Sequence, residues 1–147
     1  MTNVEIRGLN RTVRKLQRVG NNRVLVRPMT QSVSHAQNVI SQYPPSSEAN
    51  VPPAPYYKRG IGTVLASGAV RRTSERLGSR WQTRVLRGGL RGIVENATSY
   101  VLWVHDKIKQ ASFHRRRGWK TDEEVIEQES RTILGFFQAA YRRVLNE

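Results

Sequence analysis

Apolar residues near the start of the chain recur every three or four positions in two successive segments, which is typical of amphipathic α-helices. The first helix is predicted over residues 9–19. It ends at Gly20-Asn21-Asn22, because Gly and Asn tolerate the left-handed conformation of helix ends. The second is predicted over residues 26–40, with Pro28 either in its first turn or at a kink. The two stripes are Leu9, Val13, Leu16 and Val19, and Val26, Met29, Val33, Ala36 and Ile40.

Strand patterns follow in the second half of the chain. Residues 80–88 alternate, with Trp81, Thr83, Val85 and Arg87 on one face. Gly88-Gly89 suits a hairpin turn that needs positive φ, and residues 90–97 predict the returning strand. Residues 100–105 are almost continuously apolar and predict a central strand buried on both faces, which completes an antiparallel meander. Residues 2–7 alternate weakly and predict a short edge strand.

A long helix is predicted over residues 122–145. Thr121 is a good N-cap and Glu124 follows three positions later, which is the pattern of a capping box. Acidic residues in the first turn and Arg142 and Arg143 near the end suit the helix dipole. The predicted apolar face comprises Ile126, Ile133, Phe137, Ala140, Tyr141 and Val144, broadened by Val125, Leu134 and Phe136.

Residues 44–73 differ from both patterns, because they hold five of the six prolines and show no helical stripe. We predict a long extended loop or arm there, with a short strand over residues 63–66, followed by a single helical turn over residues 74–78. A connection this long is usually either disordered or functional. Its aromatic and basic cluster suits a docking surface, although disorder in the free chain stays an alternative. The candidate interface residues of this arm are Tyr56, Tyr57, Lys58 and Arg59.

These elements predict an α+β fold. N-terminal helices and a long C-terminal helix pack on a small antiparallel meander, in a single domain over residues 1–147 that includes the extended arm. A length of 147 residues suits one domain with a real core. No apolar stretch approaches the roughly 20 residues that span a bilayer, and the N-terminus lacks an apolar signal core. We therefore expect a soluble protein, without membrane contact, that is made in a cytoplasm.

The formal net charge is +14, and the first 43 residues carry seven basic residues and one acidic residue. Such a field favours a polyanion or an acidic protein surface, although a solvated basic face explains it equally well. The chain contains no cysteine, which excludes disulfides and thiolate metal sites.

Catalytic and metal-binding patterns are weak throughout the chain. The three histidines are His35, His105 and His114, and His105-Asp106 with His114 is the one candidate metal set, but its spacing matches no known ligand signature. No serine has nucleophile-elbow context, no carboxylates pair for acid–base chemistry, and no glycines form a phosphate loop. We predict no enzyme activity, no cofactor and no metal, with His105 and His114 as hydrogen-bonding residues.

The segment 106–120, called the interface loop below, interleaves aromatic and basic residues. This composition suits a protein interface, and it also suits a basic module that holds phosphates and stacks bases. No recognised nucleic-acid-binding motif surrounds it. The alternative is a basic loop that packs Trp119 on the last helix. Its candidate interface residues are Lys107, Lys109, Phe113, Arg115, Arg116, Arg117 and Trp119.

Short motifs over most of the chain resemble the virion morphogenesis, or tail-completion, proteins of tailed bacteriophages. The matching motifs are Tyr43-Pro44-Pro45, Tyr57-Lys58-Arg59-Gly60, Ser74-Glu75-Arg76-Leu77-Gly78, Ser99-Tyr100-Val101, Val104-His105, Gln110-Ala111, His114 and Gly118-Trp119-Lys120-Thr121. The chain departs from the family at Val101-Leu102-Trp103, where small Ala residues are usual.

The resemblance implies an α+β subunit of a homo-oligomeric ring, commonly hexameric, at the head–tail junction (neck) of a virion that is assembled in the host cytoplasm. Such a ring completes the tail and docks it to the head. Its partners would be connector or neck proteins and tail tube or sheath proteins. Genomic DNA would pass through the lumen without sequence-specific binding.

Overall fold

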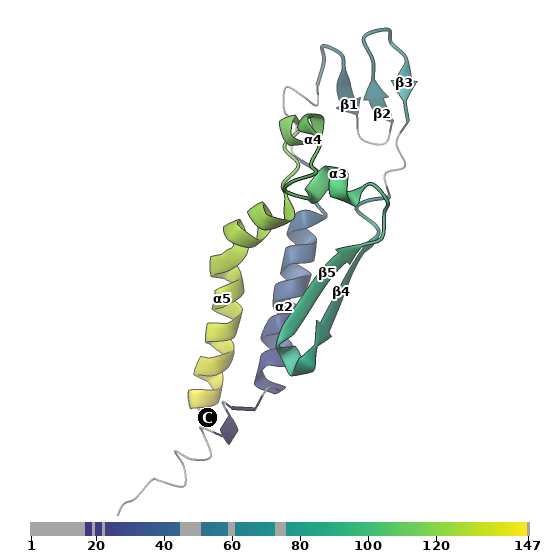
Figure 1. Ribbon diagram of the computed structural model, residues 1–147. Helices are drawn as coiled ribbons and strands as arrows, with labels where there is room; N and C mark the ends of the chain where they lie inside the picture. Colours follow the sequence, from purple (N-terminus) through teal and green to yellow (C-terminus); the bar gives the residue numbers. More distant parts are fainter. Residues whose placement is uncertain are drawn as a thin grey trace, which may run out of the picture. The chain divides into compact units, whose positions relative to one another are not determined.

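The computed structural model describes residues 17–18, 20–21, 23–44, 51–58, 61–72 and 76–146 (Figure 1). Helix α2 (Arg23–Ile40) is followed by five strands in two small antiparallel sheets and then by three further helices, so the fold of the described residues is α+β, as predicted. The elements are α2 (Arg23–Ile40), β1 (Tyr56–Lys58), β2 (Gly62–Val64), β3 (Val70–Arg71), β4 (Trp81–Leu86), the 3-10 turn η2 (Arg87–Gly89), β5 (Arg91–Asn96), α3 (Val101–His105), α4 (Ser112–Arg116) and α5 (Asp122–Asn146).

Two predicted elements lie wholly or mostly outside the described residues. The strand over residues 2–7 is entirely outside them, and of the first helix, over residues 9–19, only Gln17 and Arg18 are described, both helical. In the part of the chain that is described, no helix has the length and apolar content needed to cross a bilayer.

The chain forms two units. Unit 1 comprises Met1–His35, Arg84–Ile93 and Ser130–Glu147, and unit 2 comprises Ala36–Thr83 and Val94–Glu129. In the described ranges of unit 1, the buried apolar residues are Val33 and Pro28, and the side chain of Pro28 is fully buried. In unit 2 the buried apolar residues are Ala36, Ile40, Leu77, Val104 and Val125.

Helix α2 begins three residues before its predicted apolar stripe. The Asn21 side-chain oxygen accepts a hydrogen bond from the Arg23 amide at 3.0 Å, which satisfies one of the free donors at the helix start. Pro28 therefore lies beyond the first turn, inside the helix, and the Ser32 hydroxyl donates to its carbonyl at 2.8 Å. The stripe is buried at Val33, Ala36 and Ile40, as predicted, whereas Val26 is exposed.

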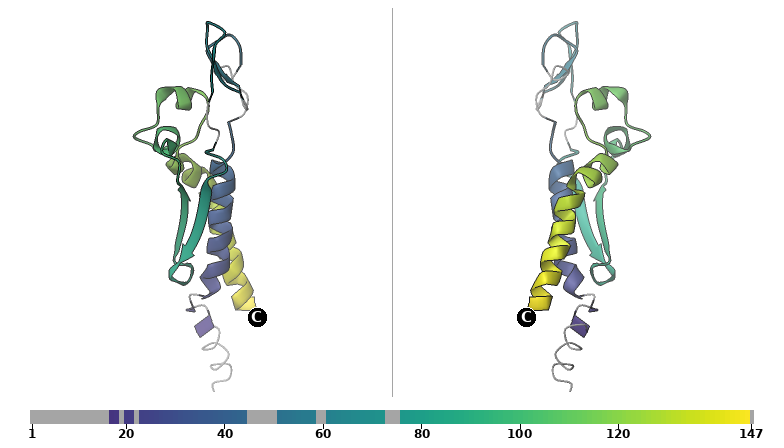
Figure 2. Two further views of the ribbon diagram at one scale, coloured as in Figure 1. Left: turned by 90° about the vertical axis from the view of Figure 1, so that its right-hand side faces the viewer. Right: turned by 90° about the vertical axis from the view of Figure 1, so that its left-hand side faces the viewer.

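Helix α2 packs against the β4–β5 hairpin on one side and against α5 on the other within unit 1 (Figures 1 and 2). A Cβ atom added at Gly92 in β5 would lie 2.6 Å from the Met29 sulfur and would also overlap Val33, so the strand and helix backbones approach closely there. On the opposite side, the rings of His35 and Phe136 meet edge to face, with centroids 5.9 Å apart. The glycine at position 92 therefore sets the spacing between hairpin and helix.

The hairpin itself follows the sequence prediction. Trp81, Thr83 and Val85 are half-buried in β4, and the residues between them are exposed. The turn has positive φ at Arg87 (52°), Gly88 (62°) and Gly89 (94°). The two glycines adopt this conformation without a steric cost.

The strand predicted over residues 100–105 is wrong, because these residues form helix α3 (Val101–His105). A short apolar run fits a buried strand or a buried helix equally well. In α3 only Val104 and His105 are buried, while Leu102 and Trp103 face solvent. The predicted three-stranded meander is therefore a two-stranded hairpin followed by a helix.

Residues 44–73 hold more regular structure than the single strand that the sequence predicts. Strands β1, β2 and β3 form an antiparallel sheet in that order, with Tyr57 opposite Thr63 and Val64 opposite Val70. Of these, β2 overlaps the strand predicted over residues 63–66. The helical turn predicted over residues 74–78 lies partly outside the described residues, and a turn is present at residues 77–79.

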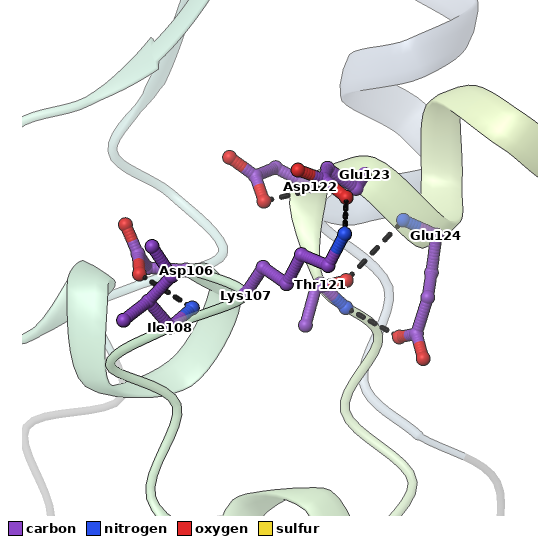
Figure 3. A network of polar contacts seen from close by, with 7 residues as sticks. All are labelled: Asp106, Lys107, Ile108, Thr121, Asp122, Glu123 and Glu124. Carbon is purple, nitrogen blue, oxygen red and sulfur yellow. Dashed lines mark hydrogen bonds and ion pairs between the residues drawn. The ribbon is translucent and has the colours of Figure 1, made fainter.

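The capping box of α5 is confirmed. The Glu124 amide donates to the Thr121 hydroxyl oxygen at 3.2 Å, and the Thr121 amide donates to a Glu124 carboxylate oxygen at 2.8 Å (Figure 3). The first buried position of the helix is Val125. Ile126, which the apolar pattern places on the buried face, is instead 53% exposed, so the buried face is offset by one residue at this end.

Substituting Thr121→Ala is expected to lower the free energy of unfolding by about 1–2 kcal/mol, because the Glu124 amide loses its partner at a buried helix start. Urea unfolding followed by circular dichroism measures the change. Thr132→Ala is the matched control: it makes the same substitution on an exposed position of α5, and we expect a change within about 0.5 kcal/mol. Equal losses in both variants would contradict the capping role.

Candidate interface site

The tip of the interface loop is held in place by its own polar groups. The Asp106 carboxylate accepts hydrogen bonds from the amides of Ile108 at 2.9 Å and Lys109 at 2.8 Å. The Lys107 ammonium forms an ion pair with Glu123 in the first turn of α5, which raises the pKa of Lys107 (Figure 3). These contacts present Ile108, which is 91% exposed, at a fixed position.

Gln110 connects three parts of the loop through one side chain. Its amide nitrogen donates to the carbonyl oxygens of Val104 in α3 and Trp119 before α5, each at 2.8 Å. Its oxygen accepts from the Arg115 guanidinium in α4 at 3.2 Å. The hydrogen bonds of Gln110 therefore join the two ends of residues 104–119. The sequence pattern did not predict this role, because it gave Gln110 only a place in the Gln110-Ala111 motif.

His105 is buried between two tryptophans. Its ring meets Trp81 and Trp119 edge to face, with centroids 5.4 and 5.3 Å away. The Nδ1 atom lies 2.7 Å from the Lys120 carbonyl oxygen, which can only accept, so Nδ1–H is the donor. This confirms the predicted hydrogen-bonding role of His105. Burial lowers its pKa, against smaller opposing effects of the Lys120 carbonyl and Asp122, so the ring is neutral at pH 7.

His114 lies against Phe113 and Trp119, with centroids 4.1 and 6.4 Å away. Its Nδ1 atom is buried and has no hydrogen-bond partner within the described residues, so that atom does not make the predicted hydrogen bond. Burial, with the nearby Arg117 charge and then His105, lowers the pKa of His114 to about 4. Trp119 also contacts Tyr43 at 5.1 Å, so the loop packs Trp119 on these rings.

Acidification from pH 6.5 toward pH 4 is expected to destabilise the fold. In the unfolded chain an imidazole has a pKa near 6.5, whereas folding lowers the pKa of His105 and brings that of His114 to about 4. The unfolded state therefore binds more protons in this window, and stability is complete above pH 6.5 and falls as the pH drops. Urea unfolding at pH 7 and pH 5 measures the loss.

The variant His114→Gln tests this assignment, because it removes one of the two groups without adding a charge. We expect the stability difference between pH 7 and pH 5 to shrink in this variant. An unchanged difference would show that the pH dependence comes from other groups.

The two candidate interface clusters meet at Arg117. Its guanidinium lies over the ring of Tyr57 at 5.4 Å and over the ring of Phe113 at 5.5 Å. Burial is the main cause that lowers the pKa of Arg117. Of the other arm residues, Tyr56 is half-buried, Lys58 is exposed, and Arg59 lies outside the described residues. The remaining loop residues Lys109, Arg115 and Arg116 are exposed.

An open pocket of about 550 Å³ lies in unit 2 between these groups. Half of the described lining residues are aromatic, and three are arginines: Arg71, Arg72 and Arg117. Among the described residues, no Asp or Glu lines the pocket. The aromatic lining residues are Tyr43, Tyr57, Tyr100, Trp103, Phe113, His114 and Trp119. A pocket of this kind suits an apolar group accompanied by negative charge.

Sequence reasoning identified Phe113, Arg117, Trp119 and Tyr57 but missed the arginines of β3 and the residue after it. Arg71 and Arg72 sit in a stretch without a helical or aromatic pattern. The pairing of β3 with β2 positions Arg71, and Arg72 follows it directly in the chain. Within the described ranges, no three His, Asp or Glu side chains gather in a way that holds a metal ion.

The arrangement is an aromatic and basic surface on a polar scaffold, with His105 buried, and with His114 half-buried in the pocket wall. Comparison with known proteins adds no relative to this picture: no family model, no curated protein and no solved structure matches the chain.

Proposed function

We propose that this chain is a structural subunit of a tailed-phage virion, which forms a homo-oligomeric ring at the head–tail junction, completes the tail and docks it to the head connector. The resemblance of its short motifs, from Tyr43-Pro44-Pro45 to Gly118-Trp119-Lys120-Thr121, supports this role. The proposal places the chain in the virion after assembly in the host cytoplasm, and it assigns the chain no enzyme activity.

The observation that carries the proposal is the exposure of large apolar side chains on a fixed scaffold. In the segment from α3 to α4, Trp103 is 55% exposed and Ile108 is 91% exposed, and Leu102 and Phe113 are also exposed. Gln110 and Asp106 fix the backbone that carries them. Aromatic and branched residues presented without a large ordering cost are typical of interface anchors.

The size of the purified full-length protein tests the ring. We expect native mass spectrometry and sedimentation to give a closed oligomer, commonly of six copies in such rings, that also binds purified connector or tail tube protein. A monomer that binds neither partner would overturn the proposal.

Substitutions in the exposed segment extend the test. Trp103→Ala combined with Ile108→Ser is expected to reduce binding to the neighbouring virion protein or to another copy, with little effect on the melting temperature, since both side chains face solvent. Leu90→Ser is the matched control, because Leu90 is an exposed apolar residue of the hairpin turn. Equal binding by all three proteins would remove this segment from the interface.

A nucleic-acid-binding module is the second candidate function. The observation in its favour is that α4 exposes Arg115 and Arg116 beside Phe113. Against it, the Arg117 guanidinium already lies over the rings of Tyr57 and Phe113, and Trp119 already packs edge to face with Tyr43 and His105. Binding to single-stranded DNA that weakens steeply with salt and is lost on triple Arg115→Ala, Arg116→Ala and Arg117→Ala substitution would favour this candidate.

A further inference from the structure

The first two turns of α5 hold a dense group of acidic residues in a chain that is otherwise strongly basic. Five of the 11 acidic residues fall between positions 122 and 129, against a net charge of +14 for the whole chain. These five are Asp122, Glu123, Glu124, Glu127 and Glu129. A contact between the basic surfaces of two copies would bring like charges together, and this segment is where the opposite charge is concentrated.

An exposed apolar side chain lies in the middle of this charge. Asp122 and Glu123 precede Ile126 by one helical turn and Glu129 follows it by three residues, so all four lie on one face of the helix. Ile126 is 53% exposed, although the preceding residue of the helix, Val125, is buried. We call Asp122, Glu123, Ile126 and Glu129 the acidic face.

The pocket of unit 2 has the complementary chemistry. Its aromatic walls suit an aliphatic side chain. Arg71, Arg72 and Arg117 supply positive charge, and the part of the lining that the structure describes contains no carboxylate. The stacking of Arg117 on Tyr57 and Phe113 orders its planar guanidinium before any partner arrives. None of the pocket residues belongs to α5, so the pocket and the acidic face are different surfaces of unit 2.

We propose that the acidic face of one copy docks in the aromatic–arginine pocket of the next copy, with Ile126 against the rings and its neighbouring carboxylates facing the arginines. This inference rests on the proposed ring and names the contact that builds it. Because the two surfaces differ, each copy offers one and accepts the other, and such a head-to-tail contact repeats until the ring closes. The contact overcomes the repulsion between basic chains because it uses their acidic segment.

Charge reversal tests the contact in the full-length protein. The pocket variant carries Arg71→Glu and Arg72→Glu, and the face variant carries Glu123→Arg and Glu129→Arg. Sedimentation and native mass spectrometry are expected to show at least a tenfold weaker association for each variant alone. Association should return when the two variants are mixed in equal amounts, and also when all four substitutions are made in one chain. Added salt should weaken the wild-type contact, because much of its attraction is electrostatic.

Two controls change the same charges elsewhere in unit 2. Arg76→Glu with Arg80→Glu reverses two exposed arginines that belong neither to the described pocket lining nor to the interface loop. Glu127→Arg reverses a charge on the same helix at a position about 100° around the axis from Ile126. Both controls should assemble like the wild type, and circular dichroism verifies that every variant is folded.

The outcomes separate this inference from the proposed function. A wild-type protein that stays monomeric at all salt concentrations and binds no virion protein overturns the proposed ring. A wild-type ring that both reversed variants still form, or a combination that fails to restore association, overturns the docking contact and leaves the ring in place. A pocket variant that keeps the ring but loses binding to a single-stranded oligonucleotide also overturns it, because the pocket then serves nucleic acid.

Discussion

Replacing Gly89 by alanine is expected to be the most damaging small substitution in unit 1. The added Cβ atom would lie 2.5 Å from the amide nitrogen of Val26 and 2.7 Å from the carbonyl oxygen of Leu25, and these are backbone atoms of α2 that cannot rotate away. Gly89 also has φ of 94°, a conformation that costs an L-residue roughly 1–2 kcal/mol by itself. The hairpin turn must therefore move away from the helix.

We expect Gly89→Ala to lower the free energy of unfolding by about 3 kcal/mol or more, since overpacking adds to the backbone strain. Urea unfolding measures the change, with hydrogen exchange of the β4 and β5 amides as a local readout. Gly68→Ala separates the two causes: Gly68 also has positive φ (78°), but apart from its chain neighbours no atom of the described residues lies within 4 Å of an added Cβ. A loss at Gly89 no larger than the loss at Gly68 would mean that the turn does not press on α2.

Replacing Trp119 by alanine is expected to have the largest effect in unit 2. The indole contacts Tyr43, His105 and His114, with centroid distances of 5.1, 5.3 and 6.4 Å. Its removal leaves a void beside His105. For a half-buried tryptophan with three edge-to-face partners we expect a loss of about 2–4 kcal/mol, somewhat below that of a fully buried one.

Thermal and urea unfolding followed by far-ultraviolet circular dichroism measure this loss without relying on tryptophan emission. Trp103→Ala is the matched control, because it removes an equally large side chain from the same unit at a position that is 55% exposed. We expect Trp103→Ala to change stability by less than about 1 kcal/mol, as is usual for surface positions. Similar losses of stability in the two variants would contradict a stabilising role for the contacts of Trp119 with Tyr43, His105 and His114.

Features set by neighbouring residues were predictable from the sequence. The capping box needs only Thr121 and Glu124, and its two hydrogen bonds form as expected. The hairpin is likewise local, since the alternation in β4 and the Gly88-Gly89 pair fix it. Helix α5 ends within one residue of its prediction.

Features that depend on distant partners were not predictable. The apolar pattern of Val101–His105 fits a buried strand and a buried helix equally well. The segment is a helix in which Val104 and His105 are buried. At the start of α5, Val125 is buried and Ile126 is exposed. The two are adjacent apolar residues, and the local sequence does not resolve which of them is buried. The candidate site shows the same limit. The loop residues follow from composition, but pairing between β2 and β3 brings Arg71 to the pocket.

The tip of the interface loop is a position at which the protein can be labelled selectively. The chain has no cysteine, so an Ile108→Cys variant would carry one thiol, at a position that is 91% exposed and held by the Asp106 carboxylate. An environment-sensitive dye attached there would move little relative to α3, and its emission would respond to whatever covers the loop. The same variant thus tests optically whether another copy or a partner protein covers the loop in solution.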